Sequence, residues 1–260
     1  MIGIVDRSTP GLGADMRRPK LTVLKTGSTL PGLLNRRGDF EDWIRQPLLR
    51  TGAEVRVVDA QAGEPLPPPG RQDGVVVTGS PSMVSRREPW SEEAADWLGS
   101  LAVRGTPIPI LGICFGHQLL AHALGGEVGR NPAGREIGTV DVECLAAAGE
   151  DPLFGTLPNP FAAHVTHEES VLTLPAEAVH LARSAGDRHQ AFRWGECAWG
   201  VQFHPEFNRA VMCDYLAGRR QLLRAEGLDP LALFRSARET PQSHGLLARF
   251  TQLCAQVELD

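Results

Sequence analysis

One cysteine stands where a covalent catalyst would carry its nucleophile. Cys114 lies within the run LGICFGHQ at 111–118, between an apolar, β-branched segment and a helix-like run over 119–124. A Gly-x-Cys-x-Gly turn from strand to helix has the spacing of a nucleophile elbow, with Cys where hydrolases often carry Ser. The two glycines permit a strained turn, and the start of a helix favours a thiolate. The alternative is a small buried hydrophobic residue, as most isolated cysteines are.

A second stretch contains the groups that would activate this thiol. The run WGVQFHPE at 199–206 places His204 directly after a short apolar strand, and Glu206 follows two residues later. A nucleophile, a base and a carboxylate that orients the base are the three parts of a catalytic triad, here in the order Cys, His, Glu. We therefore predict that Cys114, His204 and Glu206 are the catalytic residues.

Together the two stretches closely resemble the class I glutamine amidotransferase family. Its signature is a Gly-x-Cys-x-Gly-x-Gln elbow and a late His-Pro-Glu, and both occur without departure, as Gly112, Cys114, Gly116 and Gln118, and as His204, Pro205 and Glu206. The resemblance spans roughly 20–223, and the chain is similar to free-standing relatives of the GMP-synthase amidotransferase domain. It implies a flavodoxin-like three-layer α/β sandwich with a mostly parallel central sheet. The implied reaction is hydrolysis or transfer of glutamine, or of another γ-glutamyl amide, through a γ-glutamyl thioester.

The resemblance also implies an oxyanion hole made of two backbone N–H groups. In the family, the glycine equivalent to Gly79 offers its N–H to the oxyanion, and the N–H of Phe115 would be the second donor. A glycine suits this role because bare backbone can approach a reacting carbonyl. The alternative for Gly79 is an ordinary turn at the end of the apolar run at 74–77.

Three residues are predicted to bind the substrate. Gln118 lies one helical turn beyond Cys114, so its amide either touches the substrate backbone or braces the elbow. The family has a His-Gly-Asp-like segment that holds the substrate's amino group, and here it reads His167, Glu168, Glu169. The longer acid Glu169 either serves the same ammonium group or adapts the pocket to something other than free glutamine. His167 is, alternatively, an ordinary loop or cross-strand residue.

Alternating strands and helices must position these groups. Strands are expected at 21–24, 54–58 and 74–77, and the stretch 139–185 is rich in strand patterns. A loop is expected over 26–38, and helices are expected at 39–49 and at 210–223. Asp39 and Ser91 are predicted helix caps.

The two ends of the chain look different from this core. Residues 1–19 are predicted to be a loose leader, and the amidotransferase-like domain is assigned to 20–223. Residues 224–260 are expected to form a helical extension that packs on the same domain, with short helices opened by Pro230 and Pro241. The extension either covers the sheet edge, rims the active site or forms an oligomer contact.

Composition restricts the partners and the compartment. The chain has 260 residues, 42% hydrophobic, with a formal net charge of -5, which indicates neither a nucleic-acid surface nor attraction to anionic membranes. No apolar run approaches the ~18 residues that span a bilayer. Five scattered cysteines form neither a metal motif nor a disulfide framework, so a reducing cytoplasm is expected. No metal or other cofactor is expected, because nucleophile and base are both present and no nucleotide-binding loop follows a strand.

Several functions fit these residues. The first is a free-standing hydrolase or transferase acting on γ-glutamyl amides. The second is a glutaminase subunit that delivers ammonia to a separate synthase. The third is a non-catalytic binding or regulatory member of the family, against which the intact triad argues. A redox sensor is weaker, because no second cysteine lies near Cys114 in the sequence.

Overall fold

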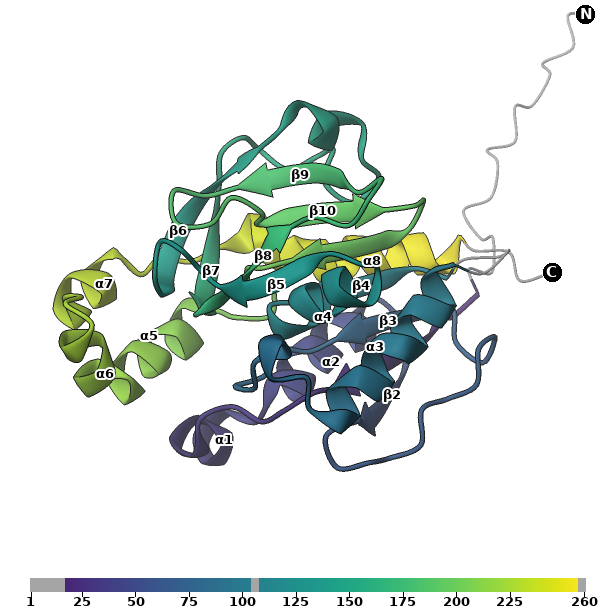
Figure 1. Cartoon of the computed structure of the whole chain (residues 1–260), viewed down its shortest axis with the longest axis horizontal. Coiled ribbons are helices and arrows are strands. Elements are labelled where there is room, and N and C mark those ends of the chain that lie inside the picture. The colour runs from purple at the N-terminus through teal and green to yellow at the C-terminus, as the bar shows by residue number, and fades with distance from the viewer. Residues whose placement is uncertain (1–16, 104–107, 257–260) are drawn as a thin grey trace, which may run out of the picture.

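A central sheet lies between two layers of helices in the computed structural model, which describes residues 17–103 and 108–256 (Figure 1). The leader predicted over 1–19 lies outside these ranges except for its last three residues. The strands of the large sheet are β1 (Lys20–Lys25), β2 (Glu54–Asp59), β3 (Gly74–Val77), β4 (Ile110–Ile113), β6 (Glu136–Cys144), β7 (Phe161–His167), β9 (Val179–Arg183), β10 (Ala191–Trp194) and β11 (Ala198–Val201). A separate antiparallel ribbon pairs β5 (Glu127–Arg130) with β8 (Glu169–Thr173).

The order of the strands is β2-β1-β3-β4-β11-β10-β9-β6-β7. The first five are mutually parallel, and the last four continue the sheet in antiparallel pairs. The helices are α1 (Pro31–Arg37), α2 (Phe40–Arg50), α3 (Pro89–Ala102), α4 (Phe115–Ala123), α5 (Arg209–Gly218), α6 (Arg220–Ala225), α7 (Pro230–Ser236) and α8 (Pro241–Ala255). The predicted α/β fold with a parallel centre is confirmed.

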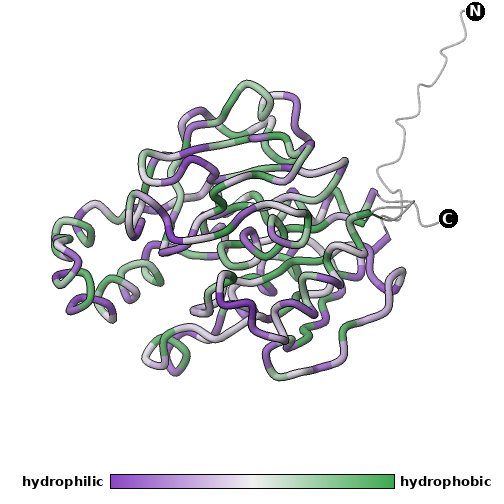
Figure 2. The backbone as a smooth tube through the Cα atoms, in the orientation of Figure 1, coloured by the Kyte–Doolittle hydropathy of each residue, from purple (hydrophilic) through white to green (hydrophobic). Residues whose placement is uncertain are grey.

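Both faces of the inner parallel strands β3, β4 and β11 are buried, as covered α/β sheets require. Along β3, Val76 belongs to one apolar cluster with Ile44 of α2 and Phe250 of α8. Its neighbours Val75 and Val77 belong to the other cluster, which α3 and α4 cover. Figure 2 shows the consequence, with hydrophobic residues concentrated along the central strands. The packed sheet is therefore a rigid base for the loops that follow its strands.

Several predicted helix boundaries were wrong. The stretch predicted as a loop over 26–38 contains helix α1, which carries Pro31 in its first turn, a position that proline favours. Helix α2 begins as predicted, with Asp39 as its cap. Helix α3 begins at Pro89 with Glu88 as the capping position, so Ser91 lies inside the helix and does not cap it.

The predicted helix over 210–223 is two helices. Helix α5 ends at Gly218 and α6 begins at Arg220, with Arg219 at φ -99° and ψ 8° between them. Glycine favours a helix less than any residue except proline, so a break is favoured here. Helices α5, α6 and α7 project to the left of the sheet in Figure 1. Helix α8 returns to pack Leu246 and Phe250 against the core. Within the described ranges, no helix has the length and apolarity needed to cross a bilayer.

Candidate active site

Cys114 occupies a strained turn between β4 and α4. Its backbone has φ 52° and ψ -102°, a conformation that residues with side chains rarely adopt. Two close approaches surround it. A Cβ at Gly112 would collide with the carbonyl of Gly116, and a Cβ at Gly116 would lie 2.6 Å from the carbonyl oxygen of Val77. Only glycine fits at positions 112 and 116, because any side chain there would collide with the backbone. The turn places the thiol at the start of α4.

Strand register carries His204 to the same edge of the sheet. Strand β11 pairs in parallel with β4, and Val201 lies opposite Ile113, so the segments after both strands leave the sheet side by side. The backbone N–H of His204 donates to the carbonyl of His164 at 2.8 Å. The imidazole stacks on Phe207 with ring centroids 4.1 Å apart. These contacts fix both the backbone and the ring plane of His204.

The imidazole of His204 is paired with Glu206. Nδ1 of His204 lies 2.7 Å from Oε1 of Glu206, and both side chains are buried. Among the described residues, Nε2 of His204 has no hydrogen-bond partner. Burial lowers the pKa of His204, but the charges of Glu206 and Cys114 outweigh burial and raise that pKa to about 10. The site therefore stabilises an imidazolium.

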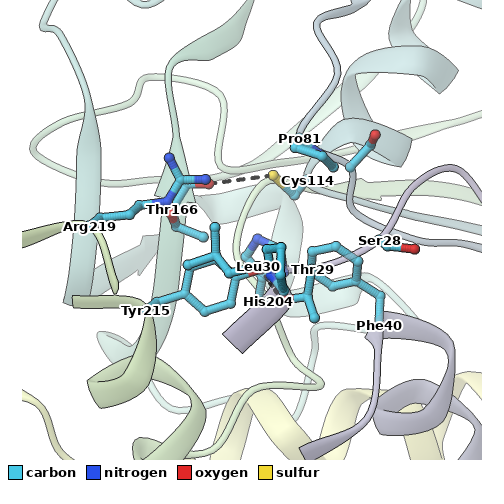
Figure 3. A pocket seen from close by; sticks show the side chains of 12 residues that line it. Ser28, Thr29, Leu30, Phe40, Pro81, Cys114, Thr166, His204, Tyr215 and Arg219 are labelled. Atoms are coloured by element: carbon cyan, nitrogen blue, oxygen red, sulfur yellow. Dashed lines mark hydrogen bonds between the residues drawn. The ribbon is translucent and has the colours of Figure 1, made fainter. Parts of the chain in front are cut away.

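Two further observations place His204 beside the cysteine. A Cβ built on Gly79 would lie 3.0 Å from Cε1 of His204 and 3.8 Å from the Cβ of Cys114, so both side chains adjoin one point. Both also line the cavity drawn in Figure 3. Next to them, burial and the charge of His204 lower the pKa of His164 to about 4, so this second imidazole is neutral.

The two predicted oxyanion donors adjoin the same cysteine. The carbonyl of Thr78 shares a peptide group with the N–H of Gly79. This carbonyl accepts a hydrogen bond from Oγ1 of Thr26 at 3.0 Å. The next carbonyl, that of Gly79, accepts from Oγ1 of Thr78 at 2.9 Å. Hydroxyl groups therefore hold the peptide planes on both sides of Gly79. Phe115 is the first residue of α4, where helix geometry leaves the N–H without an intrahelical acceptor.

The amide of Gln118 already has protein partners. Its Nε2 donates to the carbonyl of Glu169 at 2.7 Å and to Oε1 of Gln202 at 2.9 Å. Gln118 thus ties the elbow helix to β8 and to the segment that precedes His204, which is the bracing alternative of the sequence analysis. Gln118 still lines a second cavity that contains Cys114.

The two other predicted binding residues differ in what they offer a ligand. The carboxylate of Glu169 lines this second cavity and accepts hydrogen bonds from the backbone and hydroxyl of Ser85. His167 is buried, and both of its ring nitrogens are occupied. Nδ1 donates to the carbonyl of Glu169 at 2.9 Å, and Nε2 lies 2.9 Å from Oε2 of Glu136. The imidazole of His167 therefore contacts protein groups and presents no free nitrogen.

Two cavities meet at Cys114. Cys114 and His204 both line the cavity of Figure 3. The rest of its lining consists mainly of hydroxyl and apolar side chains: Ser28, Thr29, Leu30, Pro31, Phe40 and Tyr215. The second, polar cavity lies toward Gln118 and Glu169. Arg219 lines both. Neither Arg219 nor Tyr215 could be identified from the sequence as a functional residue, because both fall within what reads as one continuous amphipathic helix.

Comparisons with known proteins agree with this fold. The family model described as "Glutamine amidotransferase class-I" matches residues 33–216. The glutamine-hydrolyzing GMP synthase of Aeropyrum pernix is 36% identical over 190 residues, 69% of this chain, but the chain spans only 34% of that enzyme. A glutamine-hydrolyzing GMP synthase subunit of Methanopyrus kandleri is 33% identical over 175 residues, 67% of this chain and 87% of that subunit.

The chain is also similar to a peptidase and to a protein of known structure. Gamma-glutamyl peptidase 5 of Arabidopsis thaliana is 30% identical over 148 residues, 56% of this chain and 58% of the peptidase. A glutamine amidotransferase of Thermotoga maritima superposes with a TM-score of 0.72 at 24% identity, over 92% of this chain and 99% of that one. The chain belongs to the class I glutamine amidotransferase family of enzymes.

Proposed function

We propose that the chain hydrolyses glutamine or another γ-glutamyl amide, or transfers its acyl group, through a thioester on Cys114. One observation carries this proposal. A buried His204–Glu206 pair, with 2.7 Å between Nδ1 and Oε1, lines the same cavity as a cysteine at a strained strand-to-helix turn. That arrangement supplies a nucleophile, its base and the carboxylate that orients the base.

The reaction divides into two steps. His204 accepts the thiol proton, and the sulfur of Cys114 attacks the γ-carbonyl carbon. The N–H groups of Gly79 and Phe115 stabilise the oxyanion, each worth about 2.7–4 kcal/mol by analogy with other oxyanion holes. His204 then protonates the leaving nitrogen as the C–N bond breaks. In the second step His204 deprotonates water, water attacks the thioester, and glutamate leaves while the thiol regains its proton. Glu206 stabilises the imidazolium in both steps.

The γ-glutamyl group is assigned to the polar cavity. Gln118 and Glu169 both line it, and the carboxylate of Glu169 suits the substrate's ammonium group. For His167 we propose a positioning role, since Nδ1 holds the carbonyl of Glu169 and not a free ligand. No metal is needed in these steps, because an ionised thiol attacks without a Lewis acid.

The predicted arrangement of the chain is retained as a proposal. Residues 20–223 form the catalytic domain and 224–260 a helical extension on it, preceded by a leader at 1–19. A thiol nucleophile functions best where thiols stay reduced, so we propose the cytoplasm as its compartment.

Removing the nucleophile tests the proposal. With Cys114→Ala, glutamate release from glutamine and from a panel of γ-glutamyl amides should fall to background while the far-ultraviolet circular dichroism stays unchanged. Cys144→Ala is the matched control, because Cys144 ends β6 and lines neither cavity. Retained turnover in Cys114→Ala would contradict the assignment of the nucleophile.

A second function is an ammonia-supplying subunit for a separate synthase. The relation to the GMP synthase subunit of Methanopyrus kandleri supports it, whereas the relation to a gamma-glutamyl peptidase supports independent hydrolysis. The substrate panel distinguishes the two. An independent hydrolase should turn over γ-glutamyl amides without a partner, whereas a synthase subunit should release little glutamate, from glutamine alone, until a partner is added.

A further inference from the structure

Arg219 is a cation at the cavity, and no carboxylate of the described residues forms an ion pair with it. It lies at the break between α5 and α6, beyond residue 216, where the match to the family model ends. Figure 3 shows its side chain reaching into the cavity toward Thr166 and Cys114. Within the described ranges no carboxylate lies within 4.0 Å of its guanidinium, and its Nε is buried without a hydrogen-bond partner.

The neighbouring Arg135, in contrast to Arg219, has a guanidinium that is paired with carboxylates. Arg135 binds two carboxylates, with its Nη2 2.5 Å from Oε1 of Glu168 and its Nε 2.7 Å from Oε2 of Glu226. These pairs occupy the acids that could otherwise neutralise Arg219. Since an arginine stays protonated in proteins, Arg219 leaves a positive charge in the cavity.

The side chain of Arg219 is held in place. Its guanidinium lies over the ring of Tyr215, 5.9 Å from the centroid. The hydroxyl of Tyr215 in turn lies 2.7 Å from Oγ1 of Thr29, which follows β1. An oriented guanidinium with free N–H groups is suited to bind a carboxylate.

The direction of proton transfer indicates which part of the substrate the guanidinium of Arg219 contacts. His204 must protonate the leaving nitrogen, so the leaving amine lies on the His204 side of Cys114. Arg219 lines both cavities that meet at Cys114, but the ring of Tyr215 under its guanidinium lines, like His204, only the cavity of Figure 3. The other contains Gln118 and Glu169 and holds the acyl part in the proposed function.

We propose that Arg219 binds a carboxylate on the leaving amine. This inference rests on the proposed function and names its substrate class: γ-glutamyl amides of amino acids or short peptides with a free carboxylate. The apolar side chains of Leu30 and Phe40 form the surface against which the leaving group's own side chain packs. The junction of α5 and α6 thereby sets specificity at the rim of the active site.

Paired substrates test the proposal. The wild type should cleave γ-glutamyl-leucine about 10- to 100-fold more efficiently, in kcat/KM, than γ-glutamyl-leucine amide, which lacks only the charge. Arg219→Gln should abolish most of this preference, and Arg219→Lys should restore part of it. Arg220→Gln is the matched control, because Arg220 is exposed and lines neither cavity. A preference that persists in Arg219→Gln, or an equal loss with both compounds, would overturn the proposal.

An alkylation measurement separates this inference from the proposed function. Iodoacetate and iodoacetamide differ by one carboxylate, and both react with a free thiolate. Arg219→Gln should lower the ratio of their rates at Cys114 several-fold relative to wild type, whether or not any amide is turned over. An unchanged ratio would contradict a carboxylate-binding role. Failure to release glutamate from any compound would instead contradict the proposed function, and the ratio would still decide the role of Arg219.

Discussion

In the described part of the chain, two buried histidines are hydrogen-bonded to a carboxylate, and the two pairs differ in which atoms remain free. His204 and Glu206 are joined at 2.7 Å, and His167 and Glu136 at 2.9 Å. In the first pair, Nε2 of the imidazole has no hydrogen-bond partner among the described residues, and the ring lines a cavity with Cys114. His167 also lines a cavity with Cys114, the polar one, but its other nitrogen donates to a backbone carbonyl.

The carboxylates differ in the same way. Oε1 of Glu136 accepts from Oγ of Ser184 at 2.6 Å, and Oε2 accepts from Nε2 of Gln190 at 2.7 Å. Glu206 has one oxygen on His204 and the other without a partner in the described part of the chain. A fully satisfied pair stabilises the fold, whereas a pair with an unused nitrogen beside a thiol can move protons.

The largest effect is expected at His204, the proposed base. His204→Asn should lower kcat/KM for any γ-glutamyl substrate by about 10⁵-fold or more, because the base and its acid form are both lost. Iodoacetamide should also alkylate Cys114 more slowly at neutral pH. His167→Asn is the matched change in the other pair and should reduce turnover far less. Comparable losses in the two variants would remove the distinction between the pairs.

The next largest effect is expected at Glu206, the proposed orienting carboxylate. Glu206→Gln should lower kcat by about 10⁴-fold, by analogy with the orienting acid of serine proteases. It should also lower the pKa of His204, because the charge of Glu206 is the largest of the contributions that raise this pKa against burial. Nitrogen shifts of the imidazole, followed by NMR against pH, measure this pKa directly. An unchanged pKa would mean that Glu206 does not stabilise the imidazolium.

The same pair makes stability depend on pH. The folded pKa of His204, about 10, lies above its unfolded value near 6.5. Its contribution to the free energy of unfolding is therefore fully present below pH about 6.5 and is lost as pH rises toward 10. Urea unfolding should show a steeper loss of stability over this window in the wild type than in Glu206→Gln. Parallel curves would contradict the raised pKa.

The smallest catalytic effect is expected at Glu136. Glu136→Gln should reduce the free energy of unfolding by about 1–3 kcal/mol, because an amide nitrogen then faces groups that donate hydrogen bonds. Chemical denaturation measures this loss. Turnover by the folded fraction should fall only a few-fold, whereas a loss as large as that in Glu206→Gln would show that this pair also acts in catalysis.

The sequence was most informative where the relevant contacts are local. The elbow around Cys114 depends on glycines two residues away on each side, so its strained backbone was predictable. His204 and Glu206 are two residues apart, and their pairing follows from the same short segment. The parallel centre of the sheet was likewise predictable, from apolar runs that alternate with helices.

Contacts between distant segments were decided by the tertiary structure. No local pattern indicates that the ring of His167 turns toward Glu136, because antiparallel pairing of β6 with β7 brings these residues together. The break after Gly218, which directs Arg219 toward Cys114, is hidden in an amphipathic pattern that continues across it. The sequence by itself determined which residues are capable of the chemistry. Only the packing of the whole chain determined which nitrogen and which guanidinium remain free to act, because that depends on every neighbour that could satisfy them.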